Sequence, residues 1–178
     1  MRNFYLKDST DLTTLDIALC DWGSASWINN YLTELIQPVL LCAPEVIIGT
    51  PRGRPVDIWN LGAVLLEVID AVRMFDDRMS ETGRVYRTHH HLDEILALFG
   101  PFPPRLLAQG DPGLVARYMN EDGRSRDSIP RPYAQLKNWI EGLTGEKMEE
   151  FISLLRSMMV INPDERKTAI QLLDEPWL

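Results

Sequence analysis

The chain has 178 residues, enough for one sizeable core, and its 45% hydrophobic and 25% charged content is that of an ordinary globular domain. The formal net charge of −8 argues against nonspecific nucleic-acid binding, which needs a basic surface, and suits either a basic protein partner or simple solubility. Cys20 and Cys42 are the only cysteines, and residues 1–7 hold no apolar stretch of signal-peptide length, so we expect buried reduced thiols in an intracellular protein, cytoplasmic, nuclear or both.

The first predicted elements are a strand and a long helix. Ile17–Cys20 is a short apolar run, typical of a strand that leads into a loop. Residues 56–72 form the strongest helix, and because they are apolar on almost every side we expect this helix to be buried all round, as the central element of a helical domain. Its apolar run is interrupted by polar residues and is shorter than the roughly 20 residues of a membrane span, so no membrane partner is expected.

Residues 100–146 are the irregular part of the chain, rich in proline and glycine. A loop of that length is unusual in a compact domain, so we expect short helices near 105–108, 113–119 and 133–140. The helix before this part, which contains His89–Phe99, should end at Gly100. After it, residues 147–178 should form the final helices, the last of them opened by a capping box in Thr168–Gln171.

Three motifs carry chemical information. Asp21-Trp22-Gly23 offers a carboxylate of the kind that holds the metal in phosphoryl transfer, although a turn after a strand explains these residues equally well. They are followed by Ala43-Pro44-Glu45 and then by Asp57-Ile58-Trp59-Asn60-Leu61-Gly62. In that order and at that spacing the motifs resemble the activation segment and the following helix of eukaryotic protein kinases.

The resemblance implies a partial protein kinase domain over 1–178: a mainly α large lobe with a short β element near the N-terminus, and without the small lobe and the catalytic loop. Its activation segment would be 21–45, with an insert at about 100–146 where the related kinase group carries extra helices. Asp21 and Gly23 would contact the cofactors, ATP and Mg²⁺, with Asp21 as the metal ligand.

The same resemblance assigns structural roles. Arg166, in Asn162–Ala169, is the arginine that pairs in kinases with the glutamate of Ala-Pro-Glu, here Glu45; the alternative is an exposed arginine beside two acidic neighbours. Trp59 and Gly62 belong to the central helix. Asp57 opens that helix, and in the family its carboxylate accepts hydrogen bonds from the catalytic loop, so here it should lack those partners.

Among kinases the likeness is greatest to the SR-protein kinase branch, especially its fungal forms, through Ser24–Trp27 and Leu61–Asp70. That branch implies protein substrates, basic and Arg/Ser-rich. The stretch Pro38–Cys42 departs from the family, which carries a threonine and a tyrosine there, so the standard substrate-site hydrogen bonds are not expected. Ser24, Ser26 and Thr33 are either phosphorylation sites or ordinary loop residues.

Several kinase parts are missing from the sequence, and we assign no catalytic residue. There is no Gly-x-Gly, and Lys7, the only lysine before Asp21, does not lie in an apolar strand. His91-Leu92-Asp93 resembles a catalytic His-x-Asp but follows Asp21, with Leu98 in place of the expected asparagine. Consecutive histidines 89–91 point in different directions on a helix, which favours a solvated helix start over a metal site.

Two functions follow from these observations. The first is the large lobe of a protein serine/threonine kinase, inactive alone, that phosphorylates protein serine or threonine in the complete enzyme. The second is a non-catalytic, kinase-derived binding module or gene remnant. We expect Met1 to be an annotation artefact or the start of a remnant, and whether the chain is itself an enzyme stays open.

Overall fold

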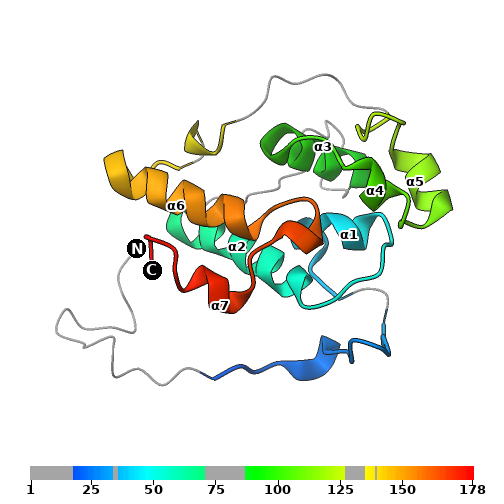
Figure 1. Cartoon of the computed structure of the whole chain (residues 1–178), viewed down its shortest axis with the longest axis horizontal. Coiled ribbons are helices and arrows are strands. Elements are labelled where there is room, and N and C mark those ends of the chain that lie inside the picture. The colour runs from blue at the N-terminus through cyan, green and yellow to red at the C-terminus, as the bar shows by residue number, and fades with distance from the viewer. Residues whose placement is uncertain (1–17, 34–35, 71–86, 127–134, 139) are drawn as a thin grey trace. The chain divides into compact units, whose positions relative to one another are not determined.

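The computed structural model describes residues 18–33, 36–70, 87–126, 135–138 and 140–178. The chain divides into two compact units, residues 1–36 and 37–178, each considered by itself. The larger unit is helical in its described residues (Figure 1). Its helices are α1 (Pro44–Ile47), α2 (Pro55–Asp70), α3 (Thr88–Phe99), α4 (Pro104–Leu107), α5 (Pro112–Tyr118), α6 (Gly145–Met158) and α7 (Ala169–Leu172), with 3-10 turns η3 (Val39–Leu41), η4 (Leu136–Asn138) and η5 (Pro163–Glu165).

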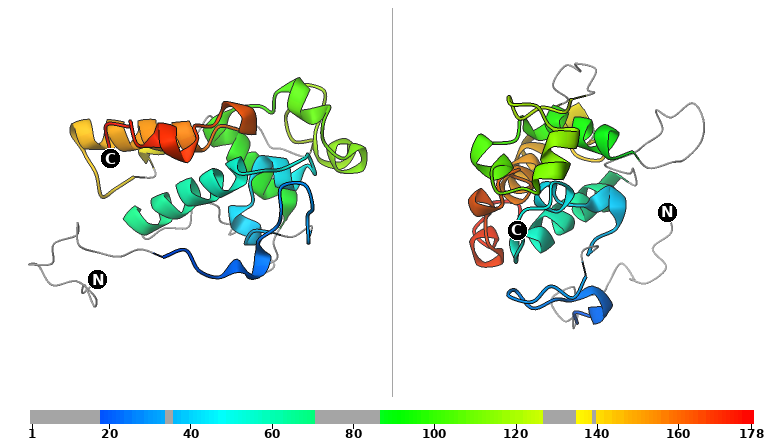
Figure 2. Two further views of the ribbon diagram at one scale, coloured as in Figure 1. Left: turned by 60° about the horizontal axis from the view of Figure 1, so that its bottom comes forward. Right: turned by 90° about the vertical axis from the view of Figure 1, so that its right-hand side faces the viewer.

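Helix α2 is the element on which the larger unit is built. It packs against α6 and contacts η3 and η5, and the views in Figures 1 and 2 show α6 lying alongside it. Among the described residues, no helix combines the length and the apolar character that crossing a membrane requires. The sequence placed this helix at 56–72; the structure begins it at Pro55 and describes it to Asp70, and residues 71 and 72 lie outside the described ranges.

One side of α2 is buried and another is not, so the expectation of burial all round is wrong. The buried side is a stripe at spacings of three and four residues: Val56, Trp59, Ala63 and Leu66. Asp57 is exposed, and so are Leu61 and Val68, at 48% and 72%. An apolar sequence shows which residues a fold can bury, whereas burial also needs a neighbouring element, and no described element covers this side.

Helix α6 supplies the other half of the core. Its buried residues are Phe151, Ile152, Leu154, Leu155 and Met158, and Met159 follows, also fully buried. Helix α6 agrees with the final helices expected over 147–178, and it is amphipathic. The predicted capping box is confirmed at α7, where the Thr168 side chain accepts from the Gln171 N–H and the Gln171 side chain accepts from the Thr168 N–H.

The part between α3 and η4 is compact despite its prolines. Helix α3 ends where expected: Gly100 has φ 91°, and its N–H donates to the Leu96 carbonyl at 3.0 Å. Short helices α4, α5 and η4 fall near the three predicted positions, although 133, 134 and 139 lie outside the described residues. The expected solvated helix start is wrong for His91, which is 2% exposed because it faces the core beside Leu92.

Within the smaller unit, residues 18–33 are all exposed, and Ile36, its other described residue, is half-buried. Residues 18–33 form one 3-10 turn, η2 (Trp22–Ser24), and an isolated bridge between Trp27 and Asn30. The strand expected at 17–20 is not present in 18–20, because no described strand pairs with it; Ile17 lies outside the described residues. Ser26 has a local role, since its Oγ accepts from the Leu32 N–H at 3.2 Å.

The two cysteines differ. Cys42 is buried, and desolvation raises the pKa of its thiol to about 11, so it is an unreactive core residue. Cys20 is exposed, contrary to the expectation of two buried thiols, because it belongs to the exposed segment 18–33.

Candidate functional site

Glu45 lies in the first turn of α1, which begins at Pro44 directly after its cap residue Ala43. A proline at this position sacrifices no helical hydrogen bond, because the first N–H groups of a helix have no partner within it. A carboxylate near a helix N-terminus also interacts favourably with the helix dipole. The side chain of Glu45 is completely buried, so its charge requires a partner of opposite sign.

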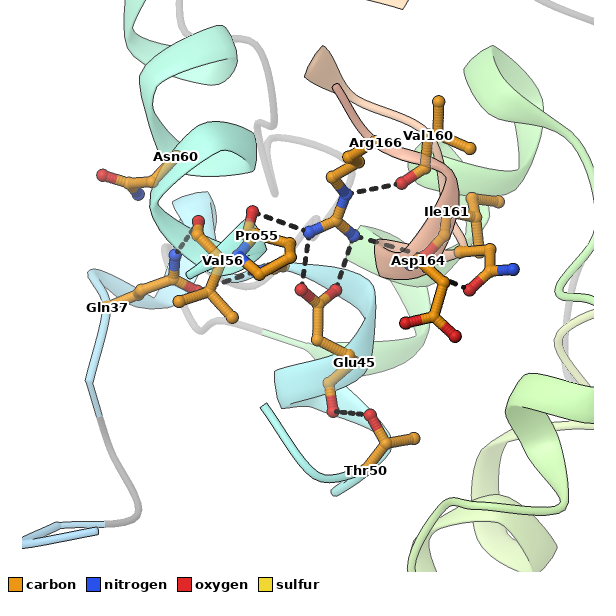
Figure 3. Close-up of polar contacts among 12 residues, drawn as sticks. Gln37, Glu45, Thr50, Pro55, Val56, Asn60, Val160, Ile161, Asp164 and Arg166 are labelled. Carbon is orange, nitrogen blue, oxygen red and sulfur yellow. Dashed lines mark hydrogen bonds and ion pairs between the residues drawn. The ribbon is translucent and has the colours of Figure 1, made fainter. Parts of the chain in front are cut away.

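That partner is Arg166, which follows η5 (Figure 3). Its Nη1 and Nη2 donate to the two carboxylate oxygens of Glu45 at 2.5 and 2.6 Å, and both side chains are 0% exposed. The remaining donors reach backbone carbonyls: Nη1 to Pro55 at 2.9 Å, Nη2 to Ile161 at 3.2 Å and Nε to Val160 at 2.7 Å. A guanidinium has five N–H groups, and here each one has an acceptor.

This geometry makes Arg166 a junction of three segments. It joins α1 through Glu45, the first residue of α2 through the Pro55 carbonyl, and the turn after α6 through Val160 and Ile161. A planar, bidentate arginine–carboxylate pair is geometrically specific as well as strong. The site therefore fixes the direction in which residues 43–47 meet the helical core.

Trp59 and Gly62 shape the surroundings of this junction. The guanidinium carbon of Arg166 lies 5.1 Å from the Trp59 ring centroid, within cation–π range, and the same ring meets Phe99 edge-on at 5.4 Å. At position 62 a Cβ would lie 2.7 Å from Cγ of Met159, so only glycine allows α2 to approach the end of α6 this closely.

Asp57 lies on the exposed side of α2. In the described part of the chain no group donates a hydrogen bond to its carboxylate, and partial desolvation raises the pKa of that carboxyl above its ordinary value. An acidic side chain in the first turn is otherwise favourably placed. The structure thus presents Asp57 as an open acceptor rather than as part of the junction.

Asp21 and Gly23 lie in the smaller unit. Asp21 has φ 61° and ψ 57°, the one non-glycine residue with positive φ in the described ranges. Gly23, two residues later, does not have positive φ. Aspartate tolerates this left-handed conformation better than most residues.

The described residues contain no group of three or more metal-ligating side chains. The role of Asp21 as a metal ligand stays a prediction.

Gln37 is a residue of this region that the sequence analysis missed. Its side chain is buried; Nε2 donates to the Val56 carbonyl at 3.0 Å and Oε1 accepts from the Ala43 N–H at 2.9 Å. The sequence held one hint of this role: Gln37 is a carboxamide directly before the apolar stretch Pro38–Cys42. A carboxamide that is buried there must find both a donor and an acceptor.

Comparison with known proteins identifies the family. The model of the protein kinase domain matches residues 2–178. The chain belongs to the protein kinase domain family, as its motifs indicated.

Relatives agree with the expected branch. A serine/threonine protein kinase of Aspergillus fumigatus is 33% identical over 160 residues, which cover 90% of this chain and 39% of that protein. SRSF protein kinase 3 of mouse is 30% identical over 172 residues, 92% of this chain and 29% of the relative. The serine/threonine-protein kinase SKY1 of Saccharomyces cerevisiae is 29% identical over 183 residues, which cover 96% of this chain and 23% of that protein. The chain thus spans about two fifths or less of the kinases it resembles.

Proposed function

We propose that this chain forms the helical lobe of a protein serine/threonine kinase, which in the complete enzyme transfers the γ-phosphate of ATP to serine or threonine of a protein. The observation that carries the proposal is the junction at Arg166, which fixes the Ala-Pro-Glu segment to α2. Phosphoryl transfer depends mainly on positioning and charge neutralisation, so a rigid attachment of the segment that follows Asp21 is a functional requirement.

Asp21 is the residue through which this lobe would meet the cofactors, Mg²⁺ and ATP. Bound Mg²⁺ neutralises developing phosphate charge, and Asp21 would supply one carboxylate ligand. Gly23, beside it, has space: a Cβ there would meet only Oδ1 of Asp21, at 3.7 Å. The Gly-rich loop, the ATP-pairing lysine and the His-x-Asp loop are not found in the 178 residues, so we expect the chain by itself to leave ATP unreacted.

The proposed substrate is a basic, Arg/Ser-rich protein, and the proposed compartment is the cytoplasm or the nucleus. Two observations support the substrate class: the net charge of −8 and the relation to kinases whose names specify SRSF proteins. Opposite charge on enzyme and substrate speeds encounter and disfavours wrong partners.

A non-catalytic binding module is the second candidate, and the exposed side of α2 favours it. Leu61 and Val68 are apolar and open there, beside the unpaired carboxylate of Asp57. In the kinase proposal other parts of the enzyme cover this side, whereas in the second proposal a separate protein does.

One experiment separates the two candidates. The native product is isolated from the source cells, its tryptic peptides are read by mass spectrometry, and phosphate transfer from labelled ATP to an Arg/Ser peptide is measured beside the 178-residue chain. The kinase proposal predicts peptides that extend before Met1 into a His-x-Asp loop, and transfer that Asp21→Asn reduces at least a thousandfold. Asp174→Asn, an exposed aspartate in the other unit, is the control. A native product that starts at Met1 and transfers no phosphate would favour the binding module.

A further inference from the structure

The side chain of Gln37 makes two buried hydrogen bonds that connect three segments. Its Nε2 donates to the Val56 carbonyl in the first turn of α2, and its Oε1 accepts from the N–H of Ala43, the cap residue of α1. Ala43 is completely buried, so without Gln37 its N–H would lose its acceptor and water could not replace it. Gln37 is also the first residue of the larger unit.

Between its two ends, the segment from Gln37 to Ala43 closes into a loop. We call residues 38–42 the η3 loop. The Leu41 N–H donates to the Pro38 carbonyl at 2.8 Å, and Sγ of Cys42 donates to the Gln37 carbonyl at 3.8 Å. A second carboxamide holds the loop from outside, because Nδ2 of Asn60 donates to the Leu41 carbonyl at 3.4 Å.

The two carboxamide contacts lie one helical turn apart on α2, at Val56 and Asn60. The neighbouring carbonyl, that of Pro55, accepts from Arg166. Consecutive carbonyls at the start of α2 therefore anchor the two ends of the segment 37–45: Val56 holds Gln37, and Pro55 holds the Glu45–Arg166 pair (Figure 3).

Two residues of the η3 loop face outward. Pro38 and Val39 are exposed, Val39 at 40%, and neither carries a polar side chain. A loop with exposed apolar residues keeps one conformation only if its ends are fixed, because the ordering entropy must be offset elsewhere. The two bonds of Gln37 supply that fixation.

We propose that Gln37 is a positioning residue: its carboxamide holds the η3 loop in a single conformation against α2, so that the loop is a preformed part of the surface that receives the protein substrate. The anchoring stands on the geometry alone; the role toward substrate rests on the kinase function proposed above. Gln37 contacts no reacting atom, and its effect passes through the loop.

The anchoring is tested in the 178-residue chain by amide hydrogen exchange measured by NMR. Gln37→Met keeps the approximate shape and removes both bonds, and it should lower the protection factor of the Ala43 amide at least tenfold relative to amides of α6. Gln109→Met is the matched control, because Gln109 is exposed and its side chain makes no bond with the described residues. It should leave the Ala43 amide unchanged.

Gln37→Glu should make the anchoring depend on pH, which a side chain that only fills space would not do. A protonated carboxyl group can accept from the Ala43 N–H and donate to the Val56 carbonyl, whereas a carboxylate can only accept. Protection of Ala43, again relative to α6, should therefore approach that of the unmodified chain at low pH and fall as the new carboxyl ionises. Gln37→Met should show no such recovery.

Two results would overturn the anchoring: unchanged protection of Ala43 in Gln37→Met, or an equal loss across Ala43 and α6 without recovery in Gln37→Glu. The substrate role is tested in the native product, where Gln37→Met should raise KM for the protein substrate at least fivefold and leave kcat and KM for ATP within twofold. A fall in kcat at constant KM would overturn that role. If the native product transfers no phosphate, the kinase proposal fails and the substrate role fails with it, while the exchange experiment still decides the anchoring.

Discussion

Glu45 and Arg166 are 121 positions apart in the chain, yet they form a bidentate ion pair with both side chains fully buried. The pair closes the larger unit, since Glu45 belongs to its first helix and Arg166 to the segment before its last. Removing two charges from water is costly. The pair is stable because every guanidinium N–H finds an acceptor, which offsets that cost.

Removal of one partner should therefore destabilise the fold strongly. Arg166→Met leaves the Glu45 carboxylate buried without its ion partner and three backbone carbonyls without their donor. We expect the free energy of unfolding to fall by about 3–5 kcal/mol, measured by urea denaturation.

The control for this variant is Arg156→Met, an exposed arginine on α6, which should change stability by less than about 0.5 kcal/mol. The double variant Glu45→Met with Arg166→Met should be less destabilised than the sum of the two single variants, because each single variant leaves an isolated buried charge and the double variant leaves none. Additive losses in this double-mutant cycle would contradict a coupled pair.

Gly62→Ala should also destabilise the fold, here through a steric clash rather than through an unpaired charge. The new Cβ would lie 2.7 Å from Cγ and 3.1 Å from Sδ of Met159. Alanine in a helix is favoured over glycine by about 1 kcal/mol, but overpacking a core costs about 1–3 kcal/mol, so we expect a small net loss in thermal denaturation.

The combination of Gly62→Ala with Met159→Ala tests that cause. Met159→Ala removes the clashing atoms, so in its background the alanine at 62 should be neutral or stabilising. If Gly62→Ala cost the same in both backgrounds, contact with Met159 would not be the reason for the glycine.

The long apolar helix could be anticipated from its pattern of side chains. The Glu45–Arg166 pair could be anticipated because the motifs resemble those of protein kinases, and that resemblance implies the pair. Gln37 could not be found in this way, since its partners are the Ala43 N–H and the Val56 carbonyl, and backbone groups occur at every position.

The open side of α2 was missed for a different reason. Leu61 and Val68 are apolar, so the helix shows no polar side and its pattern predicts burial everywhere. Hydrophobicity records the tendency to be covered, whereas coverage depends on other elements. The same limit applies to the strand expected at 17–20, which no described strand pairs with.

Acid should destabilise the protein through His91. Burial lowers the pKa of this imidazole from 6.5 to about 3 in the folded state. The unfolded chain therefore takes up a proton near pH 6.5 while the folded chain does not, and stability that is complete above that pH is lost progressively between about pH 6.5 and pH 3. One such proton corresponds to a slope of about 1.4 kcal/mol per pH unit.

His91→Met isolates this contribution, since methionine is neutral at every pH and fills a similar space. Urea denaturation at half-unit steps between pH 4 and 8 should show a shallower acid loss for the variant than for the unmodified chain. Equal slopes would mean that His91 takes up its proton in the folded state as readily as in the unfolded chain.

Asp57→Asn should be harmless in this chain and damaging in a complete kinase. The carboxylate is exposed, receives no hydrogen bond from the described residues, and has a raised pKa through partial desolvation. A folded-state pKa above the unfolded value means that folding disfavours the ionised form, so this group subtracts stability as pH rises through its titration. The neutral asparagine removes that penalty, and thermal denaturation at pH 7 should give an equal Tm or one about 1–2 °C higher.

Asp174→Asn, at an exposed aspartate after α7, controls for the change in net charge and should leave the Tm unchanged. If the active native product is recovered, Asp57→Asn should lower its stability and its phosphate transfer together, because there the carboxylate would have donors from the part that covers α2. A drop of several degrees in the 178-residue chain alone would instead show that Asp57 already has donors within it, and the exposed side of α2 would then need no covering partner at that end.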